Sequence, residues 1–304
     1  MFSVENHTVP QMGKKLFVLI GSAVGFTILA SLLASVVLLL QALSKGENVA
    51  AIHPDIIFLK VSQLIITIVT FFVPVVLLAR MNGVKSKVFV HADKRIPWML
   101  LLSVFVLMVV VQPFMNATSE WFSGWSLPTP LSWLERWLKD MEARNLDLVR
   151  QFLDVHSTGA LLFNVVVVAV SPAICEEFFF RGGLQQLFYE KMNKHAAIWL
   201  AAAIFSAVHM EVSGFLPRMV LGACFGYLFI WSGSIWLPVV AHFLNNLGGI
   251  IVEYLIYNQI TDKRLEKFGT GDTLWMTFLG LILFGVAFWY IYRQRQRELN
   301  YPTH

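Results

Sequence analysis

Long apolar segments, separated by short polar ones, make up most of the 304-residue chain. A helix that crosses a bilayer needs about 20 mostly apolar residues, and somewhat fewer where the bilayer or the helix adapts. Eight segments meet this requirement: residues 16–43, 56–79, 97–112, 160–189, 196–210, 216–231, 235–252 and 273–292. The pattern predicts one all-α, polytopic membrane domain over residues 1–304, a bundle of about eight transmembrane helices. The first segment is longer than the core of a signal peptide, so we expect it to be retained.

The connection at residues 113–158 has a different pattern, and prolines occur at positions 113, 128 and 130. Its apolar residues recur at helical spacing: Leu131, Leu134, Trp137, Leu138 and Met141. Charged residues fill the positions between them, so the segment predicts an amphipathic helix that lies at the membrane interface and caps the bundle. A role in admitting substrate is the alternative.

The distribution of lysine and arginine predicts the orientation of the bundle. Segments 80–97 and 293–304 together contain eight basic residues, whereas the 44–55 connection contains only Lys45. Since cytoplasmic loops carry an excess of lysine and arginine, we expect both termini to be cytoplasmic and residues 113–158 to lie on the opposite side. An even number of spans agrees with this arrangement, and the expected location is the cell membrane.

Composition narrows the classes of function. Hydrophobic residues are 57% of the chain and charged residues 14%, whereas soluble domains are about half apolar and about a quarter charged. The 23 basic and 19 acidic residues leave a net charge of +4, which is too small and too dispersed for a nucleic-acid partner. Cys175 and Cys224 lie in apolar segments without a CxxC spacing, which argues against a disulfide scaffold or a thiolate zinc site.

Glu176, Glu177 and Arg181 form the first of three polar clusters inside the apolar segments. Ionisable groups within a membrane span are costly and therefore indicate function. Glu177 and Arg181 are four residues apart in the favourable order, so we expect them to pair on one helix. Glu176 points about 100° away from Glu177 and is expected to stay free and face a polar cavity. A free carboxylate in such surroundings suits a general base.

The other two clusters supply two imidazoles and an amide. Phe205 and His209 end the fifth apolar segment, and His242 and Asn246 share a helix face in the seventh. Alone, a histidine or asparagine in a span often only packs or joins helices. Together with Glu176 they form a hydrolytic set, in which the base activates water and the others hold the carbonyl and the developing oxyanion.

Three spaced motifs carry a resemblance to a known family: Glu176-Glu177-x-x-x-Arg181, Phe205-x-x-x-His209 and His242-x-x-x-Asn246, in this order. They resemble the motifs of the CAAX prenyl endopeptidase and bacteriocin-processing (CPBP) family. These are intramembrane proteases of the type II CAAX endopeptidase and lysostaphin-resistance-protein-like kind. The match covers about residues 160–255, which we expect to form the catalytic core of the domain.

The resemblance implies an endopeptidase that hydrolyses membrane-associated proteins or peptides, as in CAAX-type or leader-peptide processing. It implies that Glu176 activates water. Three residues complete the catalytic site: His209, His242 and Asn246. Three others support it: Glu177, Arg181 and Phe205. The expected partners are the lipid bilayer and the membrane-associated substrate, and no pattern indicates an oligomeric state.

Metal dependence is a separate question, because the family is often described as metalloproteases. Glu176, His209 and His242 are the three possible zinc ligands. HExxH is absent, however, and the stretch that begins at His209 lacks the PCxxC partner of zinc deaminases. We therefore favour a metal-free, glutamate-activated water and expect no cofactor.

Straight, alternating spans would place His209 and His242 at depths that differ by several helical turns. Pro172 and the Gly182-Gly183 pair are expected to make one span irregular and so bring the groups together.

Two other functions fit the same residues. Glu176 and the histidines could relay protons in a component of a proton-coupled transporter. A non-catalytic bacteriocin-immunity or scaffold protein is the second alternative, although all three motifs are intact.

Overall fold

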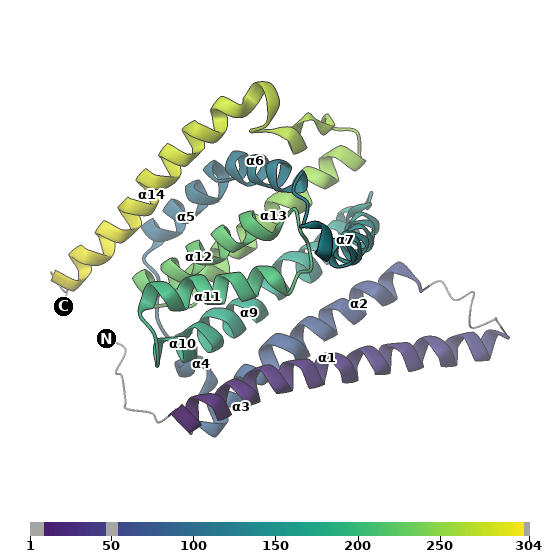
Figure 1. Cartoon of the computed structure of the whole chain (residues 1–304), viewed down its shortest axis with the longest axis horizontal. Coiled ribbons are helices and arrows are strands. Elements are labelled where there is room, and N and C mark those ends of the chain that lie inside the picture. The colour runs from purple at the N-terminus through teal and green to yellow at the C-terminus, as the bar shows by residue number, and fades with distance from the viewer. Residues whose placement is uncertain (1–8, 47–53, 301–304) are drawn as a thin grey trace.

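The computed structural model describes residues 9–46 and 54–300, and this part of the chain is helical without a β-strand (Figure 1). Its α-helices are α1 (Val9–Lys45), α2 (Ile56–Thr67), α3 (Val73–Met81), α4 (Ser86–Phe89), α5 (Trp98–Val110), α6 (Gln112–Ser123), α7 (Ser132–Leu153), α8 (Thr158–Asn164), α9 (Ser171–Glu177), α10 (Gln186–Tyr189), α11 (Lys194–Ala207), α12 (Phe215–Ser232), α13 (Trp236–Tyr257) and α14 (Leu274–Asn300). Wider π-helical turns occur at η2 (Ile68–Phe72), η4 (Val165–Val170) and η5 (Phe178–Gln185). Short 3₁₀ turns occur at η3 (Thr129–Leu131), η6 (Lys263–Lys267) and η7 (Gly271–Thr273).

Seven helical segments of the described chain are long and apolar enough to cross a membrane: Met12–Lys45, Ile56–Met81, Trp98–Ser123, Thr158–Tyr189, Phe215–Ser232, Trp236–Tyr257 and Gly271–Gln294. They confirm an all-α, polytopic membrane helix bundle. The fifth of the eight predicted spans, 196–210, is instead the shorter helix α11, which has 14 residues and ends before His209. Figure 1 shows α11 lying beside α12 within the bundle, although α11 is shorter than a membrane span.

Both ends of the described chain lie on one side of the bundle. Figure 1 shows the start of α1 and the end of α14 on the left of the molecule, and α7 on the right. Residues 1–8 and 301–304 lie outside the described residues. The shared side agrees with the expected topology, and the assignment of that side to the cytoplasm stays a prediction.

We expect cysteine labelling to place position 85 in the cytoplasm and position 139 on the opposite face. The reason is the excess of basic residues in the segment that contains Lys85. Lys85→Cys and Lys139→Cys would each be probed with a membrane-impermeant maleimide in intact cells and in inverted vesicles. Cys175 and Cys224 are buried and should give little background. Labelling of both positions from the same side would contradict the topology.

The connection between the third span and α8 is shorter than predicted. Residues 113–123 belong to helix α6 because Pro113 occupies its first turn, where a proline needs no hydrogen-bonded N–H. The amphipathic helix is confirmed as α7, which Figure 1 shows nearly end-on and thus across the long helices. Its Trp133 and Trp137 are exposed. Such exposed aromatic rings suit the predicted place at a membrane interface.

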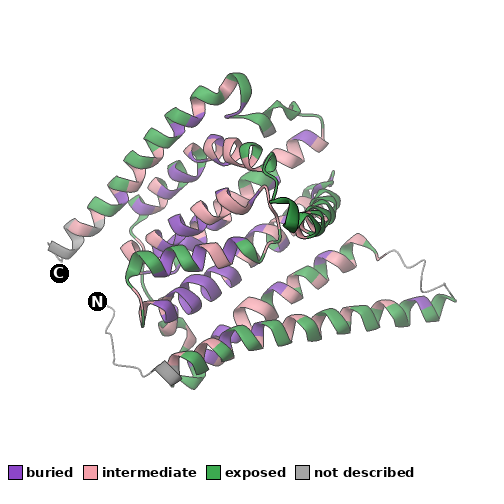
Figure 2. Ribbon diagram, viewed as in Figure 1, coloured by how far each residue is buried: buried purple, intermediate pink, exposed green. Residues whose placement is uncertain are grey.

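Buried residues concentrate in the centre of the bundle, as Figure 2 shows. One cluster surrounds Phe180 and Phe205 and joins η5, α11 and α13, and a second surrounds Phe225 in α12. Helix α1 is peripheral, since only 6% of its most apolar 18-residue stretch is buried. Glu176, Glu177, Arg181, Phe205 and His242 are buried in this part of the molecule, whereas His209 and Asn246 are half-buried.

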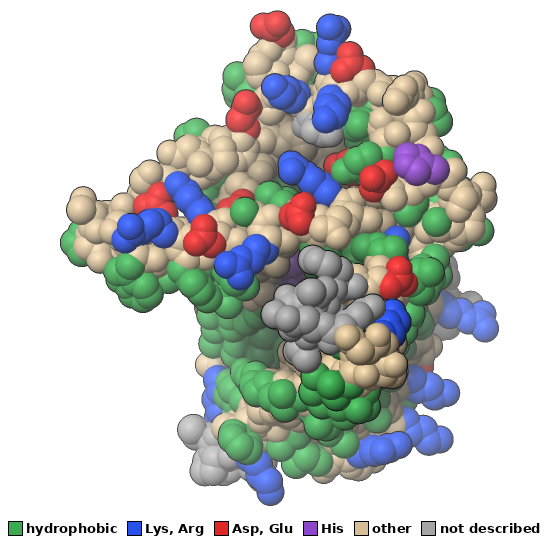
Figure 3. Space-filling view, turned by 90° about the vertical axis from the view of Figure 1, so that its right-hand side faces the viewer, with side chains coloured by type: hydrophobic (Ala, Val, Ile, Leu, Met, Phe, Trp, Pro, Cys, Tyr) green, Lys and Arg blue, Asp and Glu red, His purple; other side chains and the backbone are tan. Residues whose placement is uncertain are grey.

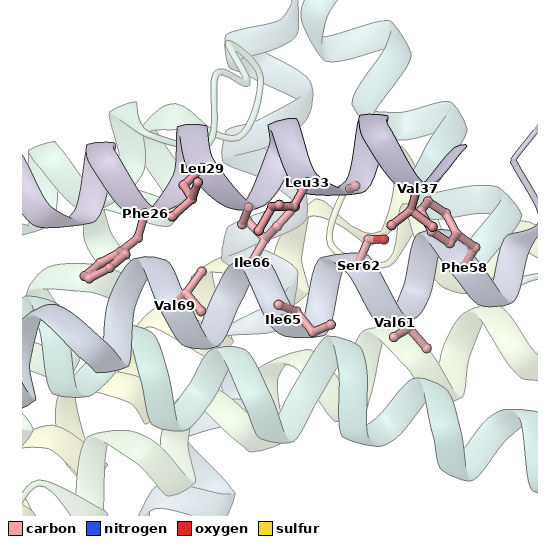
Figure 4. A pocket seen from close by; sticks show the side chains of 12 residues that line it. Phe26, Leu29, Leu33, Val37, Phe58, Val61, Ser62, Ile65, Ile66 and Val69 are labelled. Atoms are coloured by element: carbon pink, nitrogen blue, oxygen red, sulfur yellow. The ribbon is translucent and has the colours of Figure 1, made fainter. Parts of the chain in front are cut away.

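An apolar groove of about 330 Å³ separates α1 from α2 (Figure 4). Its walls include Phe26, Leu33, Phe58 and Ile66, and Ser62 is its polar residue. A lining of this kind suits hydrocarbon chains and offers no set of groups for chemistry. The groove therefore belongs to the lipid-facing periphery and is separate from the three motifs.

Candidate active site

Glu177 and Arg181 form a buried ion pair, as the four-residue spacing predicts. Glu177 Oε1 and Arg181 Nη1 are 2.9 Å apart, and the two side chains are 0% and 1% exposed. Arg181 Nη2 also donates a hydrogen bond of 2.7 Å to the carbonyl oxygen of Gly222 in α12. The pair is thus fixed to a second helix as well as to its own.

Aromatic rings enclose the Arg181 guanidinium. Its central carbon lies 4.8 Å from the ring centroid of Phe205, 5.4 Å from that of Phe225 and 6.0 Å from that of Phe180. A cation above such rings is attracted to their π-electrons, and more strongly where water is excluded. Phe205 therefore contacts the buried ion pair, and so does Phe225, which no pattern in the sequence indicated.

His242 links the two glutamates. Its Nδ1 donates a hydrogen bond of 2.9 Å to Glu177 Oε1, which fixes the ring proton on Nδ1 because a carboxylate oxygen accepts. Its other nitrogen, Nε2, then carries a lone pair and lies 3.9 Å from Glu176 Oε2. Phe225 stacks on the imidazole at 5.3 Å and 19° and holds its plane.

Glu176 remains without a counter-charge of its own, as expected. Its Oε2 is buried and has no hydrogen-bond partner among the residues that the structure describes. A buried carboxylate oxygen in this state is unusual and costly, so it calls for an explanation other than packing. The neighbouring glutamates differ in their partners: Glu177 pairs with Arg181 through Oε1, whereas Glu176 has only His242 Nε2 nearby, at 3.9 Å. Glu177 Oε2 is likewise buried without a hydrogen bond among the described residues.

His209 lies just beyond α11, and its Nδ1 donates a hydrogen bond of 2.8 Å to the carbonyl oxygen of Phe205. Burial, helped by the positive charge of Arg218, lowers the pKa of His209 to about 3. The imidazole is therefore neutral at neutral pH, and its Nε2 carries a lone pair. Such a group accepts a hydrogen bond and cannot donate one to an oxyanion, so it differs from the role that the sequence suggested.

The two histidines lie at a similar depth, because both contact the ring of Phe205. The ring centroids are 5.1 Å apart for His209 and 5.8 Å apart for His242. Helix α11 is too short to carry His209 to the far side of a bilayer. The π-helical segments η4 and η5 lie before and after the helix α9, which contains Glu176. In η5, Gly182 packs so closely on Val90 that a Cβ at this position would lie 2.7 Å from the Val90 side chain. The expected irregularity of this span is confirmed.

Asn246 follows His242 by one turn on α13. Its Nδ2 donates a hydrogen bond of 3.1 Å to the carbonyl oxygen of Val168 in η4, and its Oδ1 accepts one of 3.2 Å from Asn245. Gln112 in turn donates to Asn245 Oδ1 at 3.1 Å. Asn246 is thus held by the segment that leads to Glu176, and one N–H of its amide is left for another acceptor.

Lys60 in α2 is a buried basic residue outside the three motifs. The side chain is 4% exposed, and its Nζ lies 5.7 Å from the ring centroid of Phe152 in α7. Within the described part of the chain no carboxylate pairs with it. Helix α7 covers this position, which no pattern within α2 could reveal.

Glu176, His209 and His242 are the possible zinc ligands. Across residues 9–46 and 54–300, no group of three or more histidine, cysteine, aspartate or glutamate side chains is placed to hold a metal ion. The Nδ1 atoms of His209 and His242 both donate hydrogen bonds, which leaves one lone pair on Nε2 of each ring, and that of His242 lies 3.9 Å from Glu176 Oε2. Histidines that bind zinc also donate their other N–H, so metal independence stays a prediction.

Comparison with known proteins gives a family match over the part of the chain that contains the three motifs. Residues 158–248 match the family described as type II CAAX prenyl endopeptidase Rce1-like. The chain is 28% identical over 110 residues to a Bacillus subtilis (strain 168) protein named "Putative membrane peptidase YdiL", covering 36% of this chain and 44% of that protein. It is 27% identical over 85 residues to "Uncharacterized protein YpbD" of the same organism, covering 27% of this chain and 41% of that protein.

The alignments span less than half of the length of either relative. No match to a solved structure was found. The matched segment contains Glu176, Glu177, Arg181, His209, His242 and Asn246. The resemblance that the three motifs indicate is therefore confirmed: residues 158–248 are similar to the family described as type II CAAX prenyl endopeptidase Rce1-like.

Proposed function

We propose that the chain is an intramembrane endopeptidase in which Glu176 activates a water molecule. One observation carries this proposal: Glu176 Oε2 is a buried, unpartnered acceptor 3.9 Å from a histidine nitrogen whose ring is fixed by Glu177. Two acceptors at this separation can each take one hydrogen from the same water. The lone pairs of that water then point away from both and are available for attack.

The proposed reaction starts with proton transfer from water to Glu176 as the water oxygen attacks the peptide carbonyl carbon. The carbonyl oxygen becomes an oxyanion, which the free N–H of Asn246 can stabilise. Glu176 then returns the proton to the peptide nitrogen, the C–N bond breaks, and an acid and an amine leave. His242 keeps the water in place, and the Nε2 lone pair of His209 can accept a hydrogen bond from the leaving amine.

The buried ion pair serves this chemistry indirectly. Arg181 keeps Glu177 charged, and Glu177 keeps the proton of His242 on Nδ1. His242 Nε2 is then an acceptor for water and not a donor. Glu177 and Arg181 are therefore positioning residues, whereas Glu176 is the proposed base.

We expect hydrolysis to survive strong chelation. The arrangement of Glu176, His209 and His242 offers a base and two acceptors without a preformed metal site, and a carboxylate base can work without zinc. Activity of the purified protein would be measured in liposomes before and after incubation with EDTA or phenanthroline. Loss of activity that stoichiometric zinc restores would show that the three residues rearrange to bind metal.

The proposed substrates are membrane-associated proteins or peptides, with CAAX-type proteins and leader peptides as the two candidate kinds. A comparison of membrane-bound peptides in cells that carry the wild type or Glu176→Gln would identify them. We expect a set of peptides whose new termini appear only with the wild type. Identical peptide sets in the two strains would contradict the proposed function.

A further inference from the structure

Helix α7 holds the loop that carries His209. The loop runs from Val208 to Gly214, between the end of α11 and the start of α12, and has no regular helical structure. Met210, directly after His209, adopts a positive φ of 52°. A non-glycine residue seldom adopts this conformation unless its surroundings impose it. The position of His209 therefore depends on what holds the loop from outside.

The carboxylate of Glu142 in α7 provides most of these contacts. Its Oε2 accepts the backbone N–H of Val212 at 3.2 Å, and its Oε1 accepts that of Ser213 at 3.3 Å. Oε1 also accepts the Ser213 hydroxyl. One charged group thus satisfies two backbone donors that lie outside any helix, and hydrogen bonds to an ionised acceptor are the strong ones.

Asn145 adds a contact to His209 itself. It lies three residues after Glu142, on the same face of α7, and its Nδ2 donates a hydrogen bond of 3.4 Å to the His209 carbonyl oxygen. On the far side of the loop, Glu211 pairs with Arg218 in α12. The loop is therefore held between α7 and α12, with His209 on the α7 side.

Helix α7 is otherwise only loosely buried. Of its side chains, Phe152 and Leu153 at its C-terminal end are buried, and Figure 3 shows acidic and basic side chains gathered over the end of the molecule where α7 lies. The middle of the helix is attached through the contacts of Glu142 and Asn145. We therefore expect a substitution of Glu142 or Asn145 to affect the 208–214 loop and not the packed core.

We propose that Glu142 is a positioning residue: it holds the 208–214 loop from α7 so that His209 stays beside Phe205 and His242. This inference rests on the proposed function, because it assigns the amphipathic helix a part in the same hydrolysis. Its effect is on the rate of the chemical step, since none of these contacts from α7 reaches Glu176. Loss of the carboxylate releases the loop and displaces the His209 imidazole.

The test compares Glu142→Gln with Glu135→Gln in purified full-length protein in liposomes. Glu135 is the matched control because it lies on the same helix and also accepts a backbone N–H, that of Leu127 at 3.0 Å, far from the loop. We expect Glu142→Gln to lower kcat about 10- to 100-fold, since a shift of about 1 Å at a reacting group has an effect of this size. KM and the melting temperature should stay unchanged, and Glu135→Gln should equal the wild type.

Two further variants keep the result interpretable. Glu142→Asp retains the carboxylate on a shorter chain and is expected to recover part of kcat. Asn145→Ala removes only the contact to His209 and is expected to lower kcat less than Glu142→Gln does. This variant tests the same role if Glu142→Gln folds poorly. Equal kcat values for the wild type, Glu142→Gln and Asn145→Ala would overturn the positioning role.

Hydrogen exchange provides a readout that needs no substrate. The amides of Val212 and Ser213 should exchange at least about tenfold faster in Glu142→Gln than in the wild type, because their acceptor is weakened. Unchanged exchange would overturn the proposal, whatever the activity. If the wild type itself hydrolyses no substrate, the proposed function fails, whereas faster exchange would still show that Glu142 holds the loop.

Discussion

Glu177→Gln is expected to lower the free energy of unfolding by about 3–5 kcal/mol, the usual effect of removing one partner from a buried ion pair. The Arg181 guanidinium is 1% exposed and would keep its charge without the carboxylate beside it. The hydrogen bond to Gly222 and the aromatic rings cannot replace a full negative charge. Thermal or denaturant unfolding of the purified protein in detergent would measure the change.

Arg181→Ala should have a similar effect, because it leaves the Glu177 carboxylate buried and unpaired. The double variant should be less destabilised than the sum of the single variants, since residues in one ion pair are coupled. Glu135→Gln is the control for an exposed pair, that of Glu135 and Lys139, and should leave stability unchanged. Additive effects, or single variants as stable as the wild type, would contradict the structural role of the pair.

The pairing of Glu177 with Arg181 could be predicted because both residues lie on one helix. Helical periodicity fixes which side chains four residues apart meet, so a single sequence contains the answer. The hydrogen bond from His242 to Glu177 joins residues 65 positions apart, and the contact with Gly222 joins residues 41 apart. Such contacts depend on how helices pack, which no local pattern specifies.

The helix boundaries, like the contacts, could be predicted from the sequence only in part. Hydropathy located every apolar helix, but it could not show that the fifth is too short to span a bilayer, because the apolar pattern continues to Met210 while the helix ends at Ala207. Pro113 marks the start of α6, where proline is compatible with a helix, although prolines more often mark a break. Glu142 lies among several charged residues of α7, so its contacts with the 208–214 loop left no signal.

Glu176→Gln is expected to abolish most of the hydrolysis while leaving the fold intact. The amide has the shape of the carboxylate but cannot accept a proton from water, and general-base catalysis contributes about 10²- to 10⁴-fold to a rate. Glu176 Oε2 makes no hydrogen bond among the described residues, and Arg181 pairs with Glu177, so the replacement of Glu176 leaves Arg181 with its partner. The melting temperature should therefore stay near that of the wild type, in contrast to Glu177→Gln.

His209→Ala and Asn246→Ala should follow Glu176→Gln, with a loss of rate and little loss of stability. His242→Ala should combine both effects, because it removes the acceptor beside Glu176 and also the hydrogen bond to Glu177 Oε1. This difference between the two histidines follows from the geometry and would not be expected from their spacing in the sequence. Parallel assays of rate and melting temperature would separate the two groups.

The most direct measurement is the rate at which purified wild type and Glu176→Gln cleave one identified substrate in liposomes, with melting temperatures recorded on the same samples. The account predicts a loss of about 10²- to 10⁴-fold in kcat for the variant at an unchanged melting temperature. Cleavage by Glu176→Gln at the wild-type rate would contradict the assignment of Glu176 as the base.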